Sequence, residues 1–314
     1  MRILLVHNPD AGNGRRRSTT LARAFERCGH QVTDVTLDSD LWERCLDTPA
    51  DAIVASGGDG TARTVAVALA KRPELRLPMA LLPEGTANNI ARTLNMPRTA
   101  ATLAKSLDDA ATGRLMVGRA RGPWGEKHFV ESAGVGVFAT MLRKEKKKTR
   151  RRRKNGDRDT DEEILRGVEV LKKLLGKADP VDVEIKADGG DLSGRYLMAQ
   201  AMNIIAVGAR VELAPDADPG TPEFDLVLVS KDEREPLLEY LDRLAQGDEE
   251  AVSPLISHRC RHIEMTWPKG AGHLDDKEWP KAEKWEKDAT VEIAIATSIP
   301  VLQPRARATK TSAE

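Results

Sequence analysis

A glycine-rich turn at residues 57–61 has the residue types that phosphate chemistry requires. Its sequence is Gly-Gly-Asp-Gly-Thr, and it lies between an apolar run at 52–54 and a helical pattern at 62–70. Glycines at a strand-to-helix turn let backbone N–H groups approach an anion, and the N-terminus of the helix adds positive potential. A carboxylate at position 59 repels a bare phosphate, so Asp59 suggests a proton acceptor or a Mg²⁺ ligand beside phosphates. The pattern therefore indicates phosphoryl transfer.

Taken alone, Gly-Gly-Asp-Gly is equally typical of a tight turn in which Asp59 caps the next helix. Two further polar turns, each following an apolar run, favour the phosphate interpretation. Residues 8–14 (Asn-Pro-Asp-Ala-Gly-Asn-Gly) follow the run at 3–6, and residues 83–92, which begin Pro-Glu-Gly-Thr-Ala-Asn-Asn, follow the run at 79–82. Ligands of open α/β sheets bind at the carboxyl ends of the strands. Three such turns therefore predict one binding site at a sheet edge.

The motifs and their order resemble those of the diacylglycerol kinase catalytic-domain family over nearly the whole chain. This family includes soluble bacterial lipid kinases and the eukaryotic diacylglycerol, sphingosine and ceramide kinases. The resemblance implies ATP-dependent transfer of the γ-phosphoryl group, with Mg²⁺, to the hydroxyl of a diacylglycerol-like lipid at an interdomain cleft. Beyond the three turns, the matching segments are residues 131–139, 202–203, 207–208, 213–220 and an acidic turn at 273–280.

The same resemblance suggests roles for individual residues. Asp59 is the candidate base or metal-organising acid, and the metal ligands stay open. An arginine at 15–17 could clamp a phosphate, although a solvent-facing role is equally open for each. In the acidic turn the register is open by one residue, because Lys277 stands at the usual glycine. The residues expected at the nucleotide are Asn8, Gly12, Gly57, Gly58, Gly60, Thr61, Gly85, Thr86, Asn88, Asp276 and Glu278.

The chain departs from the family pattern at Thr221 and Pro222, where many relatives have an Asp-Gly pair whose Asp is assigned to catalysis. Threonine cannot replace a carboxylate as a base or a Mg²⁺ anchor at neutral pH. Asp218, Glu223 or Asp225 could substitute by a shift of the loop. The sequence therefore leaves a second interpretation open, a nucleotide- or lipid-binding regulator of the same fold with impaired catalysis.

Other phosphate-binding classes fit poorly. The sequence has no Gly-x4-Gly-Lys-Ser/Thr motif, which argues against a Walker-type NTPase. Residues 134–139 match a loose dinucleotide fingerprint, but a charge run follows them instead of a strand that ends in an acid. A NAD kinase should carry an Asn-Glu motif before its second domain, and residues 83–89 resemble the lipid-kinase loop instead.

Composition limits the partners and the compartment. The 314 residues carry 49 basic and 49 acidic side chains, so no global field favours nucleic acid. No apolar run reaches the roughly 20 residues of a membrane span, and no signal peptide precedes the first strand. Membrane contact is therefore expected to be peripheral, at the inner face. The three cysteines are widely spaced, which indicates reduced thiols in a cytoplasmic protein: Cys28, Cys45 and Cys260.

The pattern of elements predicts an α/β protein with two domains. Residues 1–118 alternate apolar runs with helical patterns, which is typical of a doubly wound parallel sheet that binds nucleotide. Residues 119–298 read as long strands with few helices, which favours a β-sandwich that binds the lipid substrate. We expect the run at 299–304 to return to the first domain. The oligomeric state and the identity of the lipid are not specified by these patterns.

A charged insert at 143–163 interrupts the second domain. Its basic half, residues 143–154, has the composition of an electrostatic tether to anionic phospholipid, at roughly 1 kcal/mol per basic residue near the surface. A solvated, mobile loop, in which the following acidic cluster at 157–163 neutralises the basic half, is an equally good interpretation. The apolar positions of the helix that follows are those of core packing.

Overall fold

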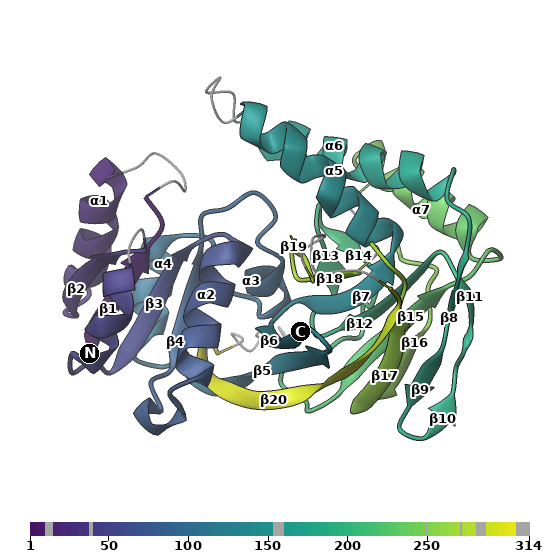
Figure 1. Cartoon of the computed structure of the whole chain (residues 1–314). Coiled ribbons are helices and arrows are strands. Elements are labelled where there is room, and N and C mark those ends of the chain that lie inside the picture. The colour runs from purple at the N-terminus through teal and green to yellow at the C-terminus, as the bar shows by residue number, and fades with distance from the viewer. Residues whose placement is uncertain are drawn as a thin grey trace, which may run out of the picture. The chain divides into compact units, whose positions relative to one another are not determined.

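The computed structural model describes residues 1–9, 15–37, 40–152, 160–248, 250–270, 272–280 and 287–305 (Figure 1). The chain divides into two compact units, which are described one at a time. The first unit comprises Met1–Gly85, Leu94–Leu115 and Ile299–Glu314, and the second comprises Thr86–Thr93 and Met116–Ser298. The domain limits drawn from the sequence stay a prediction.

The first unit is built on a parallel sheet, as the sequence predicted. Its strands are ordered β2-β1-β3-β4, and the last residues of β20 extend it, with Val301 parallel to Met79. β3 is buried along its whole length, as a strand covered on both faces must be. The bounds are β1 Arg2–His7, β2 Gln31–Thr36, β3 Ala52–Gly57, β4 Met79–Pro83 and β20 Ala289–Gln303.

Helices connect and cover these strands. α1 packs against α4 and β2, whereas α2 packs against β3 (Figure 1). The connection between β2 and β3 contains the 3-10 helix η1, a tighter form used in short connections. The bounds are α1 Arg15–Glu26, η1 Asp40–Asp47, α2 Asp59–Ala70, η2 Pro73–Leu75 and α4 Ala100–Ser106.

The second unit contains a six-stranded sheet in the order β16-β15-β12-β7-β18-β19, whose paired strands run antiparallel. A second antiparallel set joins β10, β9, β17 and the first part of β20. The bounds are β7 Ser132–Gly136, β9 Ile185–Ala187, β10 Gly190–Asp191, β12 Met198–Met202, β15 Phe224–Val229, β16 Ser257–Cys260, β17 His262–Trp267, β18 Gly272–Leu274 and β19 Lys277–Glu278.

Smaller pairings complete the strands. β5 pairs with β6 and β20, and two short hairpins join β8 to β11 and β13 to β14. β5, like β20, has residues in both units. The bounds are β5 Ala111–Gly122, β6 Gly125–Phe129, β8 Val181–Val183, β11 Gly194–Tyr196, β13 Ala206–Val207 and β14 Val211–Glu212.

Alternation along the strands gives the second unit two cores. On β15, Leu226 faces one buried cluster and Val227 the other, as the two-residue period of a strand requires. Leu226 shares its cluster with Met265 and Ile293 of the second strand set, so the two sets bury a common interior. This is the sandwich that the sequence predicted.

Three long helices cover the other core, which differs from the expectation of few helices. α5 (Val137–Arg152), α6 (Thr160–Leu175) and α7 (Arg234–Ala245) lie together, with α6 against both others (Figure 1). Their apolar positions join the cluster that contains Val227. A short helix, α3 (Asn89–Thr93), also belongs to this unit.

The charged insert is helical rather than a loop over much of its length. α5 continues through Arg152, and α6 begins at Thr160. Residues 153–159 lie outside the described residues, so the comparison of tether with solvated loop stays open there. No helix within the described part of the chain has the length and apolar content needed to cross a membrane.

Candidate nucleotide site and acidic turn

The parallel register of the first unit brings the ends of β1, β3 and β4 to one sheet edge. His7 is opposite Ser56, and Gly57 is opposite Pro83. Backbone hydrogen bonds tie the turns that follow, since Asn8 N donates to Ser56 O at 3.1 Å and Glu84 N donates to Gly57 O at 2.9 Å. The predicted first turn is described only to Pro9, so Gly12 lies outside the described residues.

Two of the predicted glycines are required by close packing. A Cβ at Gly58 would lie 3.1 Å from the Gly85 Cα, so the second and third turns touch through their backbones. A Cβ at Gly57 would overlap the Thr61 side chain. Gly60 is different, because a Cβ there would meet only Arg63 at an ordinary 3.8 Å. Packing therefore favours glycine at 57 and 58, and the role of these glycines in phosphate binding stays a prediction.

The N-terminus of α2 lies at this edge. Gly58 is the N-cap residue and provides no side chain to cap the helix, and Asp59 is the first helical residue. Asp59 therefore does not occupy the capping position that the tight-turn interpretation gave it, although its charge favours the helix dipole. Thr61 is 2 % exposed, and among the described residues its hydroxyl has no hydrogen-bond partner. An unpartnered hydroxyl and an uncapped helix N-terminus suit a phosphate oxygen.

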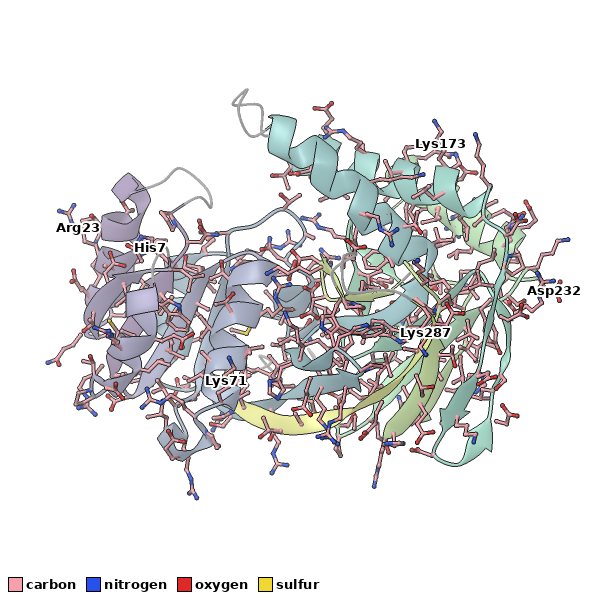
Figure 2. The ribbon with its side chains drawn as sticks, viewed as in Figure 1. His7, Arg23, Lys71, Lys173, Asp232 and Lys287 are labelled. Atoms are coloured by element: carbon pink, nitrogen blue, oxygen red, sulfur yellow. The ribbon has the colours of Figure 1, made fainter. Side chains whose placement is uncertain are left out.

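His7 occupies the position before the first turn. Its Nδ1 lies 2.7 Å from Asp34 Oδ1, and its Nε2 lies 3.4 Å from the Thr36 hydroxyl. Figure 2 labels His7 within the first unit, where it is 7 % exposed. The sequence patterns did not single it out, because its partners are on the adjacent β2 and are read only from the strand register.

The second half of the third turn belongs to the second unit. The Thr86 hydroxyl donates to Glu163 Oε2 on α6 at 2.9 Å. The Arg210 guanidinium donates to the carbonyls of Thr86 and Ala87, at 3.0 and 3.3 Å. These bonds hold the turn in which Asn88 adopts a positive φ of 55°. Arg210 is thus a positioning residue that the sequence analysis missed.

The acidic turn is a hairpin whose anchor is Asp275. This side chain is 3 % exposed and accepts backbone N–H groups from Val130, Glu131 and Ser132, at 3.0, 2.6 and 3.2 Å to Oδ1. Asp276, the predicted nucleotide contact, is exposed at the tip of the turn. The first acid of the turn is therefore structural, and the second is exposed to solvent.

Glu278, the other predicted contact, lies on β19 beside α5. Its Oε1 is 3.1 Å from Arg143 Nε, an ion pair whose geometry falls outside that of a hydrogen bond. Arg143 is the first basic residue of the charged insert. The insert and the acidic turn are therefore in contact within this unit. The sequence does not indicate this contact, because the two segments are far apart along the chain.

Comparison with known proteins shows what the chain is similar to. The diacylglycerol kinase catalytic domain matches residues 2–120. The diacylglycerol kinase of Bacillus subtilis (strain 168) is 26% identical over 250 residues, which cover 73% of this chain and 74% of that protein. The diacylglycerol kinase of Staphylococcus haemolyticus (strain JCSC1435) is 24% identical over 272 residues, covering 83% of this chain and 77% of that protein.

The chain resembles the diacylglycerol kinase catalytic-domain family, with the match to the family model confined to residues 2–120. The crystal structure of a diacylglycerol kinase from Bacillus anthracis str. Sterne has the same fold, with a TM-score of 0.65 over 97% of both chains at 18% identity. The family resemblance and the α/β fold predicted from the sequence are confirmed. The roles of the individual residues stay predictions.

Thr221, where the chain departs from the family pattern, lies in a turn that is closed by hydrogen bonds. The Thr221 hydroxyl donates to the Asp218 carbonyl at 2.9 Å, and the Asp218 carboxylate accepts the Gly220 N–H at 2.8 Å. Glu223 pairs with Arg261, and Asp225 accepts the Ser257 hydroxyl. All three carboxylates considered as substitutes are thus engaged in structural bonds.

A buried histidine supports the acidic turn. His273 Nε2 lies 2.6 Å from Gln200 Oε1, and its Nδ1 donates to the Asp275 carbonyl at 2.9 Å. Burial lowers the pKa of His273 to about 4, against the opposing effect of the bond to Asp275. The imidazole is therefore neutral near pH 7 and acts as part of the core.

Two carboxylates lie at the predicted nucleotide edge, Asp59 on α2 and Glu84 after β4. Within the part of the chain that the structure describes, no three His, Cys, Asp or Glu side chains group as a metal site. Mg²⁺ is commonly held by one or two carboxylates together with substrate phosphates and water, so the metal ligands stay open. The side chains of Arg15, Arg16 and Arg17 lie outside the described residues, so the predicted phosphate clamp stays untested.

Proposed function

We propose that this protein is an ATP-dependent lipid kinase that transfers the γ-phosphoryl group to the hydroxyl of a diacylglycerol-like lipid. The observation that carries the proposal is the edge of the parallel sheet, where Gly58 and Gly85 touch beside the uncapped N-terminus of α2. The curated relatives bear the name diacylglycerol kinase, which supports the choice of acceptor.

The phosphates of ATP would be bound mainly by the backbone. N–H groups at the start of α2 and the glycines of the second and third turns donate to phosphate oxygens, and the Thr61 hydroxyl gains the partner that it lacks. Mg²⁺, with Asp59 as its protein ligand, would neutralise charge on the phosphates. Because little covalent chemistry is required of the protein, positioning and charge neutralisation would provide most of the rate enhancement.

Asp59 would also act on the acceptor. It is half-buried at the first position of α2, next to the glycines that would bring the backbone close to the phosphates. In the base role, one carboxylate oxygen would take the proton of the lipid hydroxyl as the hydroxyl oxygen attacks the γ-phosphorus. The bond from that phosphorus to the bridging oxygen then breaks, and ADP leaves. In the metal role, the same charge would hold Mg²⁺. Both roles require the carboxylate and neither survives its replacement by an amide.

Asp59→Asn tests this proposal. We expect lipid phosphorylation to fall by at least about 100-fold, because general-base catalysis alone contributes that much. ATP binding, measured by calorimetry, should change little, since the backbone donors remain. Asp109→Asn is the matched control, because Asp109 is an exposed carboxylate of the same unit. Near-normal turnover in Asp59→Asn would show that another group does this work.

One observation favours a second function, a nucleotide- or lipid-binding regulator. Thr221 stands where relatives have a catalytic carboxylate, and the three neighbouring carboxylates are engaged in structural bonds. Lipid-dependent ATP turnover separates the two functions. A protein that binds ATP but phosphorylates none of a panel of diacyl lipids, monoacyl lipids and sphingoid bases is a regulator.

A further inference from the structure

An extended segment between α7 and β16 alternates strictly between buried and exposed side chains. Ala251, Ser253 and Leu255 point inward and are 8, 9 and 8 % exposed. Ala251 and Leu255 belong to the same buried cluster as the apolar residues of α7, so the inner row fixes the segment in place. The outer row therefore projects from a well-anchored backbone.

The outer row is apolar. Val252 is 73 % exposed, Ile256 is 81 % exposed, and the exposed Pro254 lies between them. Among the described residues, the remaining large exposed hydrophobic side chain, Leu165, is only 39 % exposed. Single exposed aliphatic residues are ordinary, but these two share one side of one segment, about 13 Å apart by strand geometry. We call residues 252–256 the apolar ridge.

Two kinds of partner could cover such a ridge, a second copy of the chain or a lipid surface. A second copy that adds a strand needs backbone donors, and Pro254 has none. The neighbouring edge strand β16 carries exposed His258 and Arg259, and polar or charged side chains at an edge also oppose strand addition. Two aliphatic side chains and a proline fall far short of the roughly 800 Å² per partner that a stable interface buries.

We propose that the apolar ridge docks the protein on a lipid bilayer by inserting Val252, Pro254 and Ile256 among the acyl chains at the interface. A small apolar protrusion with polar neighbours suits shallow insertion, which requires no large complementary surface. The charges that flank the ridge are of opposite sign, Glu250 before it and Arg259 after it. Apolar burial rather than charge therefore drives the docking.

This inference rests on the proposed function in one respect, the need of a lipid kinase to reach a substrate dissolved in a membrane. The ridge belongs to the second unit, the one expected to bind the lipid. Its chemistry differs from that of the basic residues at 143–154, which would bind anionic lipid through charge. The charge contribution weakens with salt and requires anionic lipid, whereas apolar insertion does neither, so the two can be measured separately.

Vesicle sedimentation of the full-length protein tests the ridge without any catalytic readout. On vesicles of phosphatidylcholine alone, which carry no net charge, we expect wild type to bind equally at low and high salt. Val252→Ser with Ile256→Ser should lower the partition coefficient by at least about tenfold. Leu165→Ser is the matched control and should bind like wild type. All three proteins should have the same melting temperature, because each changed side chain is on the surface.

Results of two kinds, on vesicle binding and on oligomeric state, would overturn the proposal. One is equal binding of the double variant and wild type, or no binding of wild type to phosphatidylcholine vesicles. The other is a wild-type dimer and a monomeric double variant in light scattering, which would make the ridge an interface between copies.

Kinase assays distinguish a failure of this inference from a failure of the proposed function. With diacylglycerol in vesicles the double variant should be slower than wild type, and with a dispersed short-chain diacylglycerol the two should be equal. A slower double variant on the dispersed lipid would instead mean that the ridge affects catalysis, against the proposal. If neither protein phosphorylates any lipid while ridge-dependent vesicle binding remains, the proposed function fails and the ridge stands.

Discussion

Replacement of Asp275 by asparagine should destabilise the second unit strongly. The carboxylate is 3 % exposed and accepts three backbone N–H groups at the start of β7. Asparagine has the same shape and tolerates the positive φ of 51° at this position, so the substitution changes the charge without straining the backbone. The substitution disturbs the backbone contacts that join the start of β7 to the hairpin carrying Asp276 and Glu278.

The size of the effect follows from the hydrogen bonds. Bonds to a charged acceptor contribute about 1.5–3 kcal/mol each, whereas neutral ones contribute about 0.5–1.5 kcal/mol. Weakening the three bonds therefore costs about 3 kcal/mol. In addition, the amide nitrogen of asparagine at the Oδ2 position would face another donor, the Val130 N–H, which lies 3.2 Å from Oδ2. An amide is easier to bury than a carboxylate, which offsets part of this loss. We expect a net loss of about 2–3 kcal/mol.

Asp188 provides a matched control. It has a similar φ of 47° and its carboxylate accepts backbone N–H groups from Arg261 and His262, but it is exposed to water. Asp188→Asn should cost less than about 1 kcal/mol, because water replaces the lost interaction. Urea unfolding, followed by circular dichroism, gives both free energies. If the Asp275 and Asp188 variants lose equal stability, burial does not strengthen these bonds and the reasoning is wrong.

Three further outcomes are expected. Because burial lowers the pKa of His273 to about 4 from 6.5, stability should fall by roughly 3 kcal/mol as the pH drops through that range, and His273→Gln should flatten the unfolding profile there. Burial raises the pKa of Cys260 to about 12, so iodoacetamide at pH 8 should alkylate Cys28 and Cys45 well before Cys260 in mass spectra of the native protein. Thr221→Asp with Pro222→Gly should raise kcat more than it changes ATP affinity. If wild type already phosphorylates lipid rapidly and the double variant has the same kcat, another group provides the catalytic charge.

The parallel sheet could be predicted because its information is local. β1, β3 and β4 are short apolar runs followed within two residues by asparagine or glycine, and parallel register then brings those turns to one edge. The steric need for glycine at Gly58 follows from the same arrangement, since the third turn must pass close to the second. Gly60 shows the limit of the pattern, because no close neighbour requires it to be glycine.

The anchors of the second unit depend on contacts that the sequence separates. Asp275 meets backbone groups about 145 positions away, and Arg210 reaches the turn at Thr86 from 124 positions away. No local pattern reports such pairs. α7 could have been predicted from local sequence, because Leu237, Leu241 and Leu244 follow the helical period. It lies among long apolar runs that favour strands, and these predicted few helices in this region.

Under the proposed function, binding and transfer would depend on different parts of this chain. The predicted nucleotide cradle would use backbone groups, with Gly57 and Gly58 at positions where a side chain would be crowded, so it would tolerate the loss of carboxylates elsewhere. Transfer would depend on charge near the reacting phosphate, for which Asp59 is present and the carboxylate that the family resemblance implies at position 221 is absent. An active kinase and an inactive binder would therefore have the same cradle and similar ATP affinity. For this reason turnover, rather than nucleotide binding, decides between the two proposed functions.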